Sequence, residues 1–469
     1  MNHAQLICHL KLMFCTIIMC FPQIIIGGSF IFSSTLLEQL REPSSSINLN
    51  IDQESWIASI SVLLCPVGFL AVGLLTDKYG RRKTLQIIYV PLILSWITFI
   101  IADSYRMLVT ARILMGIPLS AATCTTMYIV ESCPANVRSL HFSLVTVCSS
   151  TGMMLECILS IYYHWKTISA IMCVMCVVNL LTLFSVPEPS IWLRAKGRIE
   201  EAEKVDKWFD LRHITVANAA ESSANTVNKG DGPHLENTTD TKDKPYWLLF
   251  IHPTVWKPTL ILLIFYICQQ GSGLYVLLFY TMDVLRDFRV PWDSNTVSIF
   301  LSVARLLGGI SFGLLHWCKK RTMVAISGGS MAGSLIIAIA YSKMFINVEH
   351  PPYMVILVFA FVAYMFFALI GLLTMPWVLS SELYPISVKG VMNGLASSFG
   401  YVICFFVCKI YPYMIKYFGV EIVWSIFALF CLLTVLFAIF IMPETKGKSL
   451  EEILSYFESH KDIKNKNVP

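Results

Sequence analysis

Phe265-Tyr-Ile-Cys-Gln-Gln-Gly-Ser-Gly-Leu-Tyr-Val-Leu-Leu-Phe-Tyr-Thr281 lies inside an apolar run from Trp256 to Met282 that is long enough to cross a bilayer. Two adjacent glutamines, Gln269 and Gln270, stand near the middle of that run. A buried amide without a hydrogen-bond partner costs roughly 2–7 kcal/mol, depending on the reference state. We therefore expect both amides to face a polar cavity inside the protein. The alternative is that they only join this helix to a neighbouring helix.

The side chains around the glutamines indicate what such a cavity holds. If the run forms one continuous helix, its Gln269, Gly273, Val276 and Tyr280 share a face. That face carries an amide, a glycine that permits close approach, and a phenol. Such a surface suits a neutral molecule rich in hydroxyl groups, because amides and phenols both donate and accept hydrogen bonds.

The composition places the chain in a membrane. Of its 469 residues, 56% are hydrophobic and 14% are charged, whereas soluble proteins have about 25% charged residues. The apolar runs are continuous rather than alternating, which excludes a β-barrel. The 15 cysteines have no paired spacing and indicate neither a disulfide framework nor a zinc site. No nucleophile–base pair points to an enzyme, and we expect no cofactor and no nucleic-acid partner.

Apolar runs predict an all-α membrane protein with about twelve transmembrane helices in two sets of six. The first run, from Leu12 to Phe32, is too long for a signal peptide, so no cleavable leader is expected. We divide the chain into an N-terminal six-helix bundle (1–187), a soluble segment (188–254), a C-terminal six-helix bundle (255–442) and a tail (443–469). The runs begin near Leu12, Trp56, Thr84, Met107, Ser139, Thr167, Trp256, Ser294, Thr322, Pro352, Val388 and Gly419.

Lysine and arginine placement predicts the topology. The loops after even-numbered runs carry more of these residues close to the membrane than the loops after odd-numbered runs. By the positive-inside rule, both termini and the soluble segment are then cytoplasmic, and we expect a multi-pass protein of the plasma membrane. The cations concerned are Lys78, Arg81, Arg82, Lys83, Arg194, Lys196, Arg198, Lys204, Lys207, Lys319, Lys320 and Arg321.

The soluble segment divides into two parts. Between Gly197 and Phe209, apolar residues recur near helical spacing, and glutamates precede lysines by four positions, which favours a helix. We expect this amphipathic helix to lie on the cytoplasmic face. The polar stretch 217–244 is expected to be a disordered linker.

Charged residues at the cytoplasmic helix ends suggest a gate. The turn within Gly73-Leu-Leu-Thr-Asp-Lys-Tyr-Gly-Arg-Arg-Lys83 carries one carboxylate, Asp77, which can latch two helices by charge-assisted hydrogen bonds. The simpler alternative is a plain positively charged loop. Each exposed pair contributes only about 0–1 kcal/mol, but several together can bias a conformational equilibrium. The candidate network comprises Asp77, Arg81, Arg82, Glu131, Arg138, Glu188, Arg321, Glu382, Lys389 and Glu444.

These motifs resemble those of the sugar-porter family of the major facilitator superfamily, in particular its branch of facilitated trehalose transporters of insects. The resemblance covers nearly the whole chain. It rests on Asp52-Gln-Glu-Ser-Trp56, Gly73–Arg82, Arg112 with Gly116, Glu131 with Arg138, Pro187-Glu-Pro-Ser-Ile-Trp-Leu193, Gln269-Gln-Gly-Ser-Gly273 with Tyr280-Thr281, Pro376-Trp377, Glu382-Leu-Tyr-Pro385 and Pro443-Glu-Thr-Lys-Gly-Lys-Ser-Leu450.

The resemblance implies the major facilitator fold, with two bundles around a central site that opens alternately to each side. Gln269 and Gln270 then hold a sugar, and Trp377 stacks on its ring, because an indole face covers the apolar C–H side of a sugar. Trp377 also has a simpler interpretation as aromatic packing beside a proline break. Tyr275 and Tyr280 are further candidates for binding the substrate. The resemblance also adds Arg112 to the gating network.

The chain departs from the family at several positions. Tyr275 stands where an asparagine is usual, and Ala304 takes the place of another. Lys389 replaces an arginine and loses bidentate pairing. An unmade hydrogen bond to a buried partner costs about 1–3 kcal/mol. We therefore expect an altered sugar preference or a weaker transport rate.

Proton-coupled relatives carry an aspartate on the first helix, and the first run here has no acid between Leu12 and Phe32. We therefore expect facilitated diffusion, the uniport of a sugar such as trehalose or a hexose. Glu156 and Arg305 are intramembrane charges and hence functional candidates, although Glu156 can lie near the outer interface and Arg305 can pair with a carbonyl. The alternatives are a sugar-sensing receptor that does not transport and a carrier of another small solute such as an organic ion.

Overall fold

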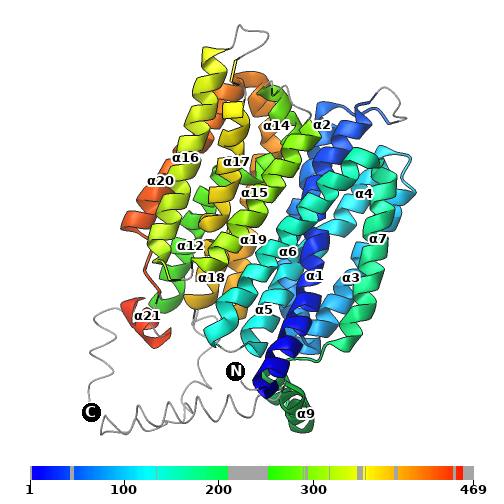
Figure 1. Cartoon of the computed structure of the whole chain (residues 1–469), viewed down its shortest axis with the longest axis vertical. Coiled ribbons are helices and arrows are strands. Elements are labelled where there is room, and N and C mark those ends of the chain that lie inside the picture. The colour runs from blue at the N-terminus through cyan, green and yellow to red at the C-terminus, as the bar shows by residue number, and fades with distance from the viewer. Residues whose placement is uncertain are drawn as a thin grey trace.

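The computed structural model describes residues 3–42, 47–133, 135–209, 252–288, 290, 294–315, 317–345, 352–353, 355–384, 389–446 and 450–457. The expected linker 217–244 lies outside these residues, and so do the side chains of Arg138 and Lys389. The described part is built of helices without a β-strand. Two bundles lie side by side, and the axes of their long helices are roughly aligned (Figure 1).

The N-terminal bundle contains the first six crossings. The α2 helix begins with a capping box, in which the Asn50 side chain accepts from the Gln53 backbone and the Gln53 side chain accepts from the Asn50 backbone. The fourth crossing is two α-helices joined by a 3₁₀ turn at Pro118. The elements are α1 (His3–Leu40), α2 (Ile51–Tyr79), α3 (Arg81–Ile100), α4 (Tyr105–Gly116), η1 (Pro118–Ala121), α5 (Ala122–Ser132), α6 (Ala135–Tyr162), α7 (Trp165–Thr182) and η2 (Leu183–Ser185).

The C-terminal bundle repeats this arrangement with a break in its first and fourth crossings. The fourth is divided between α17 and α18 by a short turn ahead of Pro376. The elements are α12 (Pro253–Gly271), α13 (Leu274–Phe279), α14 (Thr281–Asp287), α15 (Ser294–Leu314), α16 (Lys320–Met344), α17 (Val355–Ile370), α18 (Met375–Glu382), α19 (Lys389–Phe418) and α20 (Val420–Phe440).

The seventh crossing corrects one expectation from the sequence. It is three helices rather than one, because the backbone of Gly273 has φ +81°, a left-handed conformation that ends the regular helix. A second break follows at Tyr280, which has φ −126° and ψ 32°. Gln269, Val276 and Tyr280 therefore do not share the face that a continuous helix gives them.

The described residues contain eleven helices that are long and apolar enough to cross a membrane. The broken stretch from α12 to α14 provides the remaining crossing, which agrees with the twelve helices predicted from the sequence. The two bundles meet where α2 packs against α19 and where α6 packs against α15. This arrangement leaves a cavity between the bundles.

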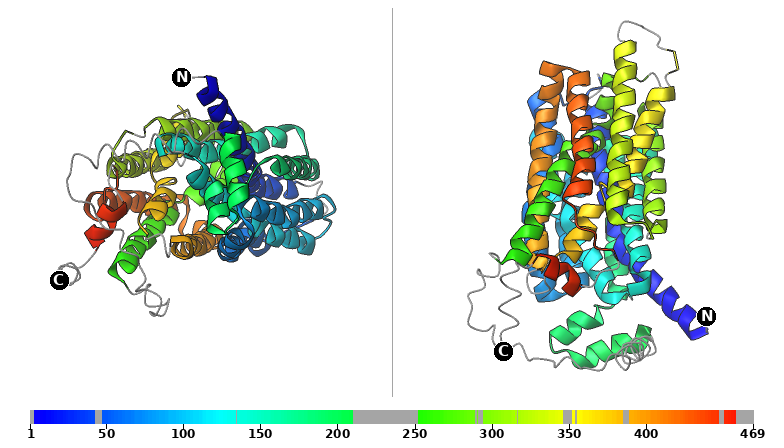
Figure 2. Two further views of the ribbon diagram at one scale, coloured as in Figure 1. Left: turned by 90° about the horizontal axis from the view of Figure 1, so that it is seen from below. Right: turned by 90° about the vertical axis from the view of Figure 1, so that its left-hand side faces the viewer.

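Helices outside the bundles mark one end of the molecule. The predicted amphipathic helix is present as α9 (Ile199–Phe209), preceded by α8 (Ser190–Ala195). Its Ala202 packs with Trp192, Leu193 and Val205. A further helix, α21 (Leu450–Phe457), lies at the same end, where α1 begins (Figures 1 and 2). We call this end, which also contains the α2–α3 and α15–α16 connections, the basic side, and the other end the opposite side.

Candidate substrate site and gates

A cavity of about 540 Å³ lies between the two bundles. It extends from Tyr275 in the seventh crossing to Asp77, Arg81 and Glu131 at helix ends on the basic side. Small-molecule sites have volumes of roughly 300–1,000 Å³, so the cavity is large enough for a sugar. Its wall includes uncharged polar side chains from both bundles, namely Gln23, Thr123, Thr126, Thr146, Ser149, Tyr275, Thr374, Asn393 and Tyr401.

Two of the predicted substrate residues, Tyr275 and Trp377, lie on the cavity wall. Their rings belong to an aromatic cluster around Tyr401, whose centroid is 6.2 Å from that of each. Trp377 also packs against Phe69 of α2 at 5.9 Å. The indole is half-buried, so it contributes to the wall and to the packing between the two bundles at once.

The glutamine pair lies behind the wall rather than on it. Gln269 Nε2 donates to the backbone oxygens of Leu372 at 3.0 Å and Leu373 at 3.1 Å. Those carbonyls belong to the turn between α17 and α18, and Leu373 and Thr374 of that turn line the cavity. The Gln269 amide therefore supports a segment of the wall. This is the contact expected if the glutamine joins its helix to a neighbouring helix.

Each glutamine nevertheless retains an unused hydrogen-bonding group. The Oε1 atoms of Gln269 and Gln270 are buried without a hydrogen-bond partner among the described residues. Leaving such an acceptor unpaired is unfavourable by about 1–3 kcal/mol. The predicted substrate residue Tyr280 lies off the wall, and its hydroxyl donates to the Cys408 carbonyl oxygen at 3.2 Å.

Charged residues at the basic side of the N-terminal bundle form one cluster. Arg81 Nη2 donates to Glu131 Oε1 at 2.5 Å. The Glu188 carboxylate accepts from three backbone N–H groups that begin α3, those of Arg81 at 2.8 Å, Arg82 at 3.2 Å and Lys83 at 3.1 Å. A carboxylate is favourable there because a helix N-terminus carries a partial positive charge. The cluster therefore joins the ends of three crossings within one bundle.

The C-terminal bundle has the same cluster at the corresponding place. Lys320 Nζ donates to Glu382 Oε1 at 2.5 Å and to Thr445 Oγ1 at 3.0 Å. The Glu444 carboxylate accepts from the backbone N–H groups of Lys320 and Arg321 at 3.3 Å each, where α16 begins. Lys320 thus occupies the role that Arg81 has in the first bundle. Arg321, which the sequence placed in the charge network, donates its guanidinium N–H groups to carbonyl oxygens at the end of α20.

The other predicted network residues take different positions. Arg112 is fully buried, and its Nε donates to the Ile57 carbonyl oxygen at 2.9 Å. Its partners are carbonyl oxygens and a thioether rather than a carboxylate. Asp77 stands at the mouth of the cavity, and Arg82 Nη1 donates to the Val186 carbonyl oxygen at 2.9 Å.

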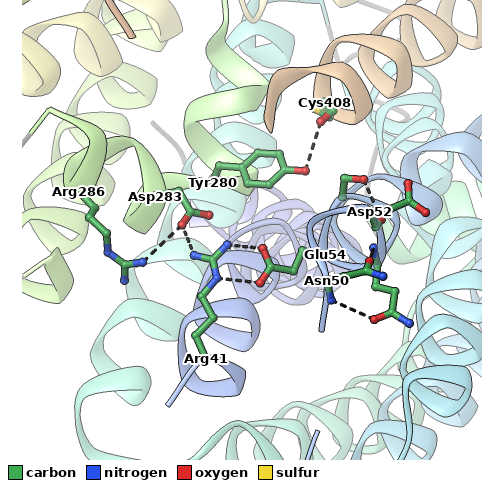
Figure 3. A network of polar contacts seen from close by, with 10 residues as sticks. Arg41, Asn50, Asp52, Glu54, Tyr280, Asp283, Arg286 and Cys408 are labelled. Atoms are coloured by element: carbon green, nitrogen blue, oxygen red, sulfur yellow. Dashed lines mark hydrogen bonds and ion pairs between the residues drawn. The ribbon is translucent and has the colours of Figure 1, made fainter. Parts of the chain in front are cut away.

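Ion pairs on the opposite side join the two bundles. Arg41, just after α1, donates to both carboxylate oxygens of Glu54 at 2.9 and 2.5 Å and to the carboxylate of Asp283 in α14 (Figure 3). The hydrogen-bonded Glu54 carboxylate, together with Asp283, raises the pKa of the Arg41 guanidinium despite partial burial. Arg286 Nη1 lies 3.9 Å from Asp283 Oδ1 in the same cluster.

A second contact on this side joins α2 to α19. Lys409 Nζ donates to Asp52 Oδ1 at 2.7 Å and lies 4.3 Å from the centroid of the Trp56 ring. The Tyr413 hydroxyl donates to the same Asp52 atom at 3.0 Å. Sequence analysis did not single out these ion pairs, because their members are separated by 242 and 357 residues. The structure is therefore closed on the opposite side, whereas its cavity reaches the basic side.

Two bundles of membrane-spanning helices enclose a cavity that is closed at one end and has polar side chains on a largely apolar wall, which is the architecture of a multi-pass membrane carrier. Residues 12–457 match the family described as sugar (and other) transporter, and the chain belongs to that family. The members of this family are described as transporters and not as enzymes.

Individual relatives are distant but extend over most of the chain. The facilitated trehalose transporter Tret1 of Drosophila grimshawi is 25% identical over 92% of this chain, which spans only 46% of that relative's length. Tret1 of Apis mellifera ligustica is 23% identical over 92% of this chain and 85% of its own length. The sugar transporter ERD6-like 6 of Arabidopsis thaliana is 25% identical over 88% of this chain and 84% of its own.

Solved structures show the same fold. The proton:xylose symporter XylE bound to 6-bromo-6-deoxy-D-glucose superimposes with a TM-score of 0.76 over 95% of this chain and 98% of that chain, at 20% identity. An inward open conformation of XylE gives 0.68 over 94% and 99%, at 19% identity. At these identities the likeness shows the major facilitator fold alone, and it confirms the predicted fold class.

Proposed function

We propose that this chain carries a sugar, trehalose or a hexose, across the membrane by alternating access and without a coupling ion. The observation that carries the proposal is the asymmetry of the ion pairs. On the opposite side, Arg41 and Lys409 connect the two bundles. On the basic side, the described pairs of Arg81 and Lys320 each stay within one bundle. When the contacts between the bundles on the opposite side break and the bundles close on the basic side, the cavity opens to the opposite side.

The wall residues support a sugar as substrate. Tyr275, Tyr401 and Asn393 offer hydroxyl and amide groups that both donate and accept, as sugar hydroxyls require. The Trp377 indole supplies an apolar surface beside them. Gln269 holds the turn that bears Thr374, and both glutamines have an unpaired acceptor oxygen behind the wall. Tyr280 holds the start of α14 to α19 on the closed side. The relatives named as trehalose transporters favour a sugar as the substrate.

The positive-inside rule supports the proposed orientation. The connections on the basic side carry the cations around Arg81 and Lys320, and both ends of the described chain lie there. We place this side in the cytoplasm and the protein in the plasma membrane, so that the structure is the inward-facing state of the carrier.

The test is uptake of labelled trehalose and labelled glucose by cells that express the full chain. We expect saturable entry, and faster exit of label when unlabelled sugar is present outside, because a carrier returns faster when it is loaded. Entry of neither sugar above background would overturn the proposal. Saturable binding without flux would identify a receptor instead.

A further inference from the structure

One cavity residue is unexpected in a site for a neutral sugar. Arg305 of α15 lies on the cavity wall and is only 5% exposed. Its Nε and Nη1 atoms are buried and have no hydrogen-bond partner among the described residues. A guanidinium stays charged in proteins, so the cavity wall carries a positive charge whose Nε and Nη1 donors find no acceptor in the described part of the chain.

The other charges around the cavity do not neutralise it. Glu131 is paired with Arg81 at 2.5 Å on the basic side, and Asp77 lies at the mouth of the cavity, at the end of α2. No ion pair of Arg305 with either acid is found in the described part of the chain. Neither of these two acids therefore balances the charge of Arg305 on the cavity wall.

Glu156 is the remaining acid to consider, because its helix α6 packs against α15. The neighbouring Cys157 lies 3.6 Å from Ser302, one turn from Arg305. Yet both Glu156 carboxylate oxygens are buried without a partner among the described residues, and Glu156 does not line the cavity. The two opposite charges are thus on facing helices and are not paired in this state.

Physical chemistry favours an anion as the missing partner. Taking one ion out of water costs several kcal/mol unless an opposite charge or hydrogen bonds compensate it. The planar guanidinium matches a carboxylate, with which it can form two parallel hydrogen bonds. The hydroxyl and amide groups of Tyr275, Thr146 and Gln23 on the same wall suit a polyol. The wall therefore combines recognition of a sugar with recognition of one negative charge.

We propose that the preferred substrate is a hexose-sized sugar that bears one carboxylate, and that Arg305 binds this carboxylate. The inference rests on the proposed sugar transport and names the class of sugar. A uniporter for such a monoanion moves one net negative charge in each cycle, because Arg305 belongs to the protein and returns with the empty site. Uptake then responds to membrane potential, which uptake of a neutral sugar does not.

The experiment uses the purified full chain in liposomes, with labelled D-glucuronate and labelled D-glucose as probes. We expect the wild type to take up D-glucuronate with an apparent affinity at least tenfold higher than that for D-glucose. An inside-positive potassium diffusion potential should accelerate D-glucuronate uptake severalfold. Arg305→Gln should lower the ratio of glucuronate uptake to glucose uptake at least tenfold. Arg305→Lys keeps the charge but not the planar guanidinium, so its ratio should lie between those of the wild type and Arg305→Gln.

Glu156→Gln is the matched control, because it removes the other buried charge on the facing helix. We expect it to leave the ratio of the two uptakes unchanged. If Glu156→Gln alters the ratio as much as Arg305→Gln does, the assignment of anion binding to Arg305 alone is overturned.

The remaining outcomes separate this inference from the proposed function. Glucose uptake without glucuronate uptake overturns the inference and leaves sugar transport in place. If the wild type takes up none of D-glucuronate, D-glucose and trehalose, both the inference and the proposed function are overturned. If Arg305→Gln does not fold, the wild type still decides, because glucuronate uptake that ignores the diffusion potential contradicts the movement of net charge.

Discussion

The Gly80–Glu188 contact sets a limit on side-chain size at one residue. Gly80 has φ +100°, and a Cβ atom there would lie 2.6 Å from Glu188 Oε1, the carboxylate that caps α3. We expect Gly80→Ala to destabilise the protein by about 1–3 kcal/mol through backbone strain and displacement of the cap. The midpoint of thermal unfolding in detergent should fall by several degrees, with a matching loss of uptake.

Gly73 provides the control for this substitution. It lies inside α2, and a Cβ atom there would meet nothing within 4 Å. Gly73→Ala should therefore leave the unfolding midpoint unchanged or raise it slightly, since alanine is favoured over glycine in a helix by about 1 kcal/mol. Equal unfolding midpoints for the two variants would show that the Glu188 cap does not constrain position 80.

Gln269 allows a second test at the scale of one side chain. Gln269→Ala removes both hydrogen bonds to the turn before α18 and leaves the Leu372 and Leu373 carbonyls unpaired. Each unsatisfied group is unfavourable by about 1–3 kcal/mol, so the wall of the cavity should shift. We expect saturable uptake to be lost while the amount of protein at the cell surface stays normal. Unchanged uptake would remove the glutamine pair from the site.

Sequence reasoning found the residue types at the gates more easily than their partners. It placed Glu131, Glu188 and Glu382 in a charge network, and each has polar contacts at a helix end. It did not predict that Glu188 would bind backbone N–H groups, because composition does not show which groups a fold leaves unpaired. It also missed Lys320, although alignment of the two bundles on Arg82 and Arg321 places Lys320 opposite Arg81.

At the scale of helices, the sequence was most informative where a run was long and uniformly apolar. The seventh crossing is the exception, because a helical period assumes an unbroken backbone. Gly273 has a left-handed backbone, and α13 begins after it as a separate helix. The glycines and the two glutamines were visible in the sequence, but whether a glycine permits close approach or ends a helix depends on its neighbours. Here the Phe427 ring would lie 2.3 Å from a Cβ atom at position 273.

The end of α1 and the short α14 should separate when their ion pair is removed. Arg41→Gln removes the contact with Asp283 and both hydrogen bonds to Glu54. Partly exposed pairs contribute about 0–1 kcal/mol each, so the closed state should lose about 1–2 kcal/mol, and a difference of about 1.4 kcal/mol changes a population tenfold. We expect faster hydrogen exchange in residues 34–41 and in α14, measured by mass spectrometry.

Arg286→Gln is the matched control for this experiment. Arg286 lies in the same cluster, but its side chain is 58% exposed and its nearest carboxylate contacts are at 3.9 and 4.0 Å. Its removal should change exchange in the same peptides little. If both variants exchange alike, the closed side does not depend on the contact between Arg41 and Asp283.

For the whole molecule, the two bundles repeat one design, and that repetition explains why distant charges matter. Glu188 and Glu444 each cap the helix that begins on the basic side, and Arg81 and Lys320 each bind a glutamate from a neighbouring crossing. In the proposed alternating access, such clusters keep each bundle rigid while the bundles rock against each other. The sequence could predict the twofold repetition, but the side on which the bundles are joined depends on the conformational state and is encoded in no local motif.

At the scale of the whole carrier, we expect transport to be independent of a proton gradient. Arg112 of α4 donates to the Ser29 carbonyl oxygen of α1 at 3.4 Å, and the described part of α1 holds no acidic side chain before Glu38. Up to that residue, the first crossing therefore offers no carboxylate whose protonation could change the balance between the two states. Labelled D-glucose inside liposomes that contain the full chain should therefore rise to the outside concentration and no further, with or without an inward proton gradient. Accumulation above that level, lost in Glu156→Gln, would instead identify the buried carboxyl of α6 as the proton carrier, because Glu156 has no hydrogen-bond partner in the described chain and its helix packs along α1.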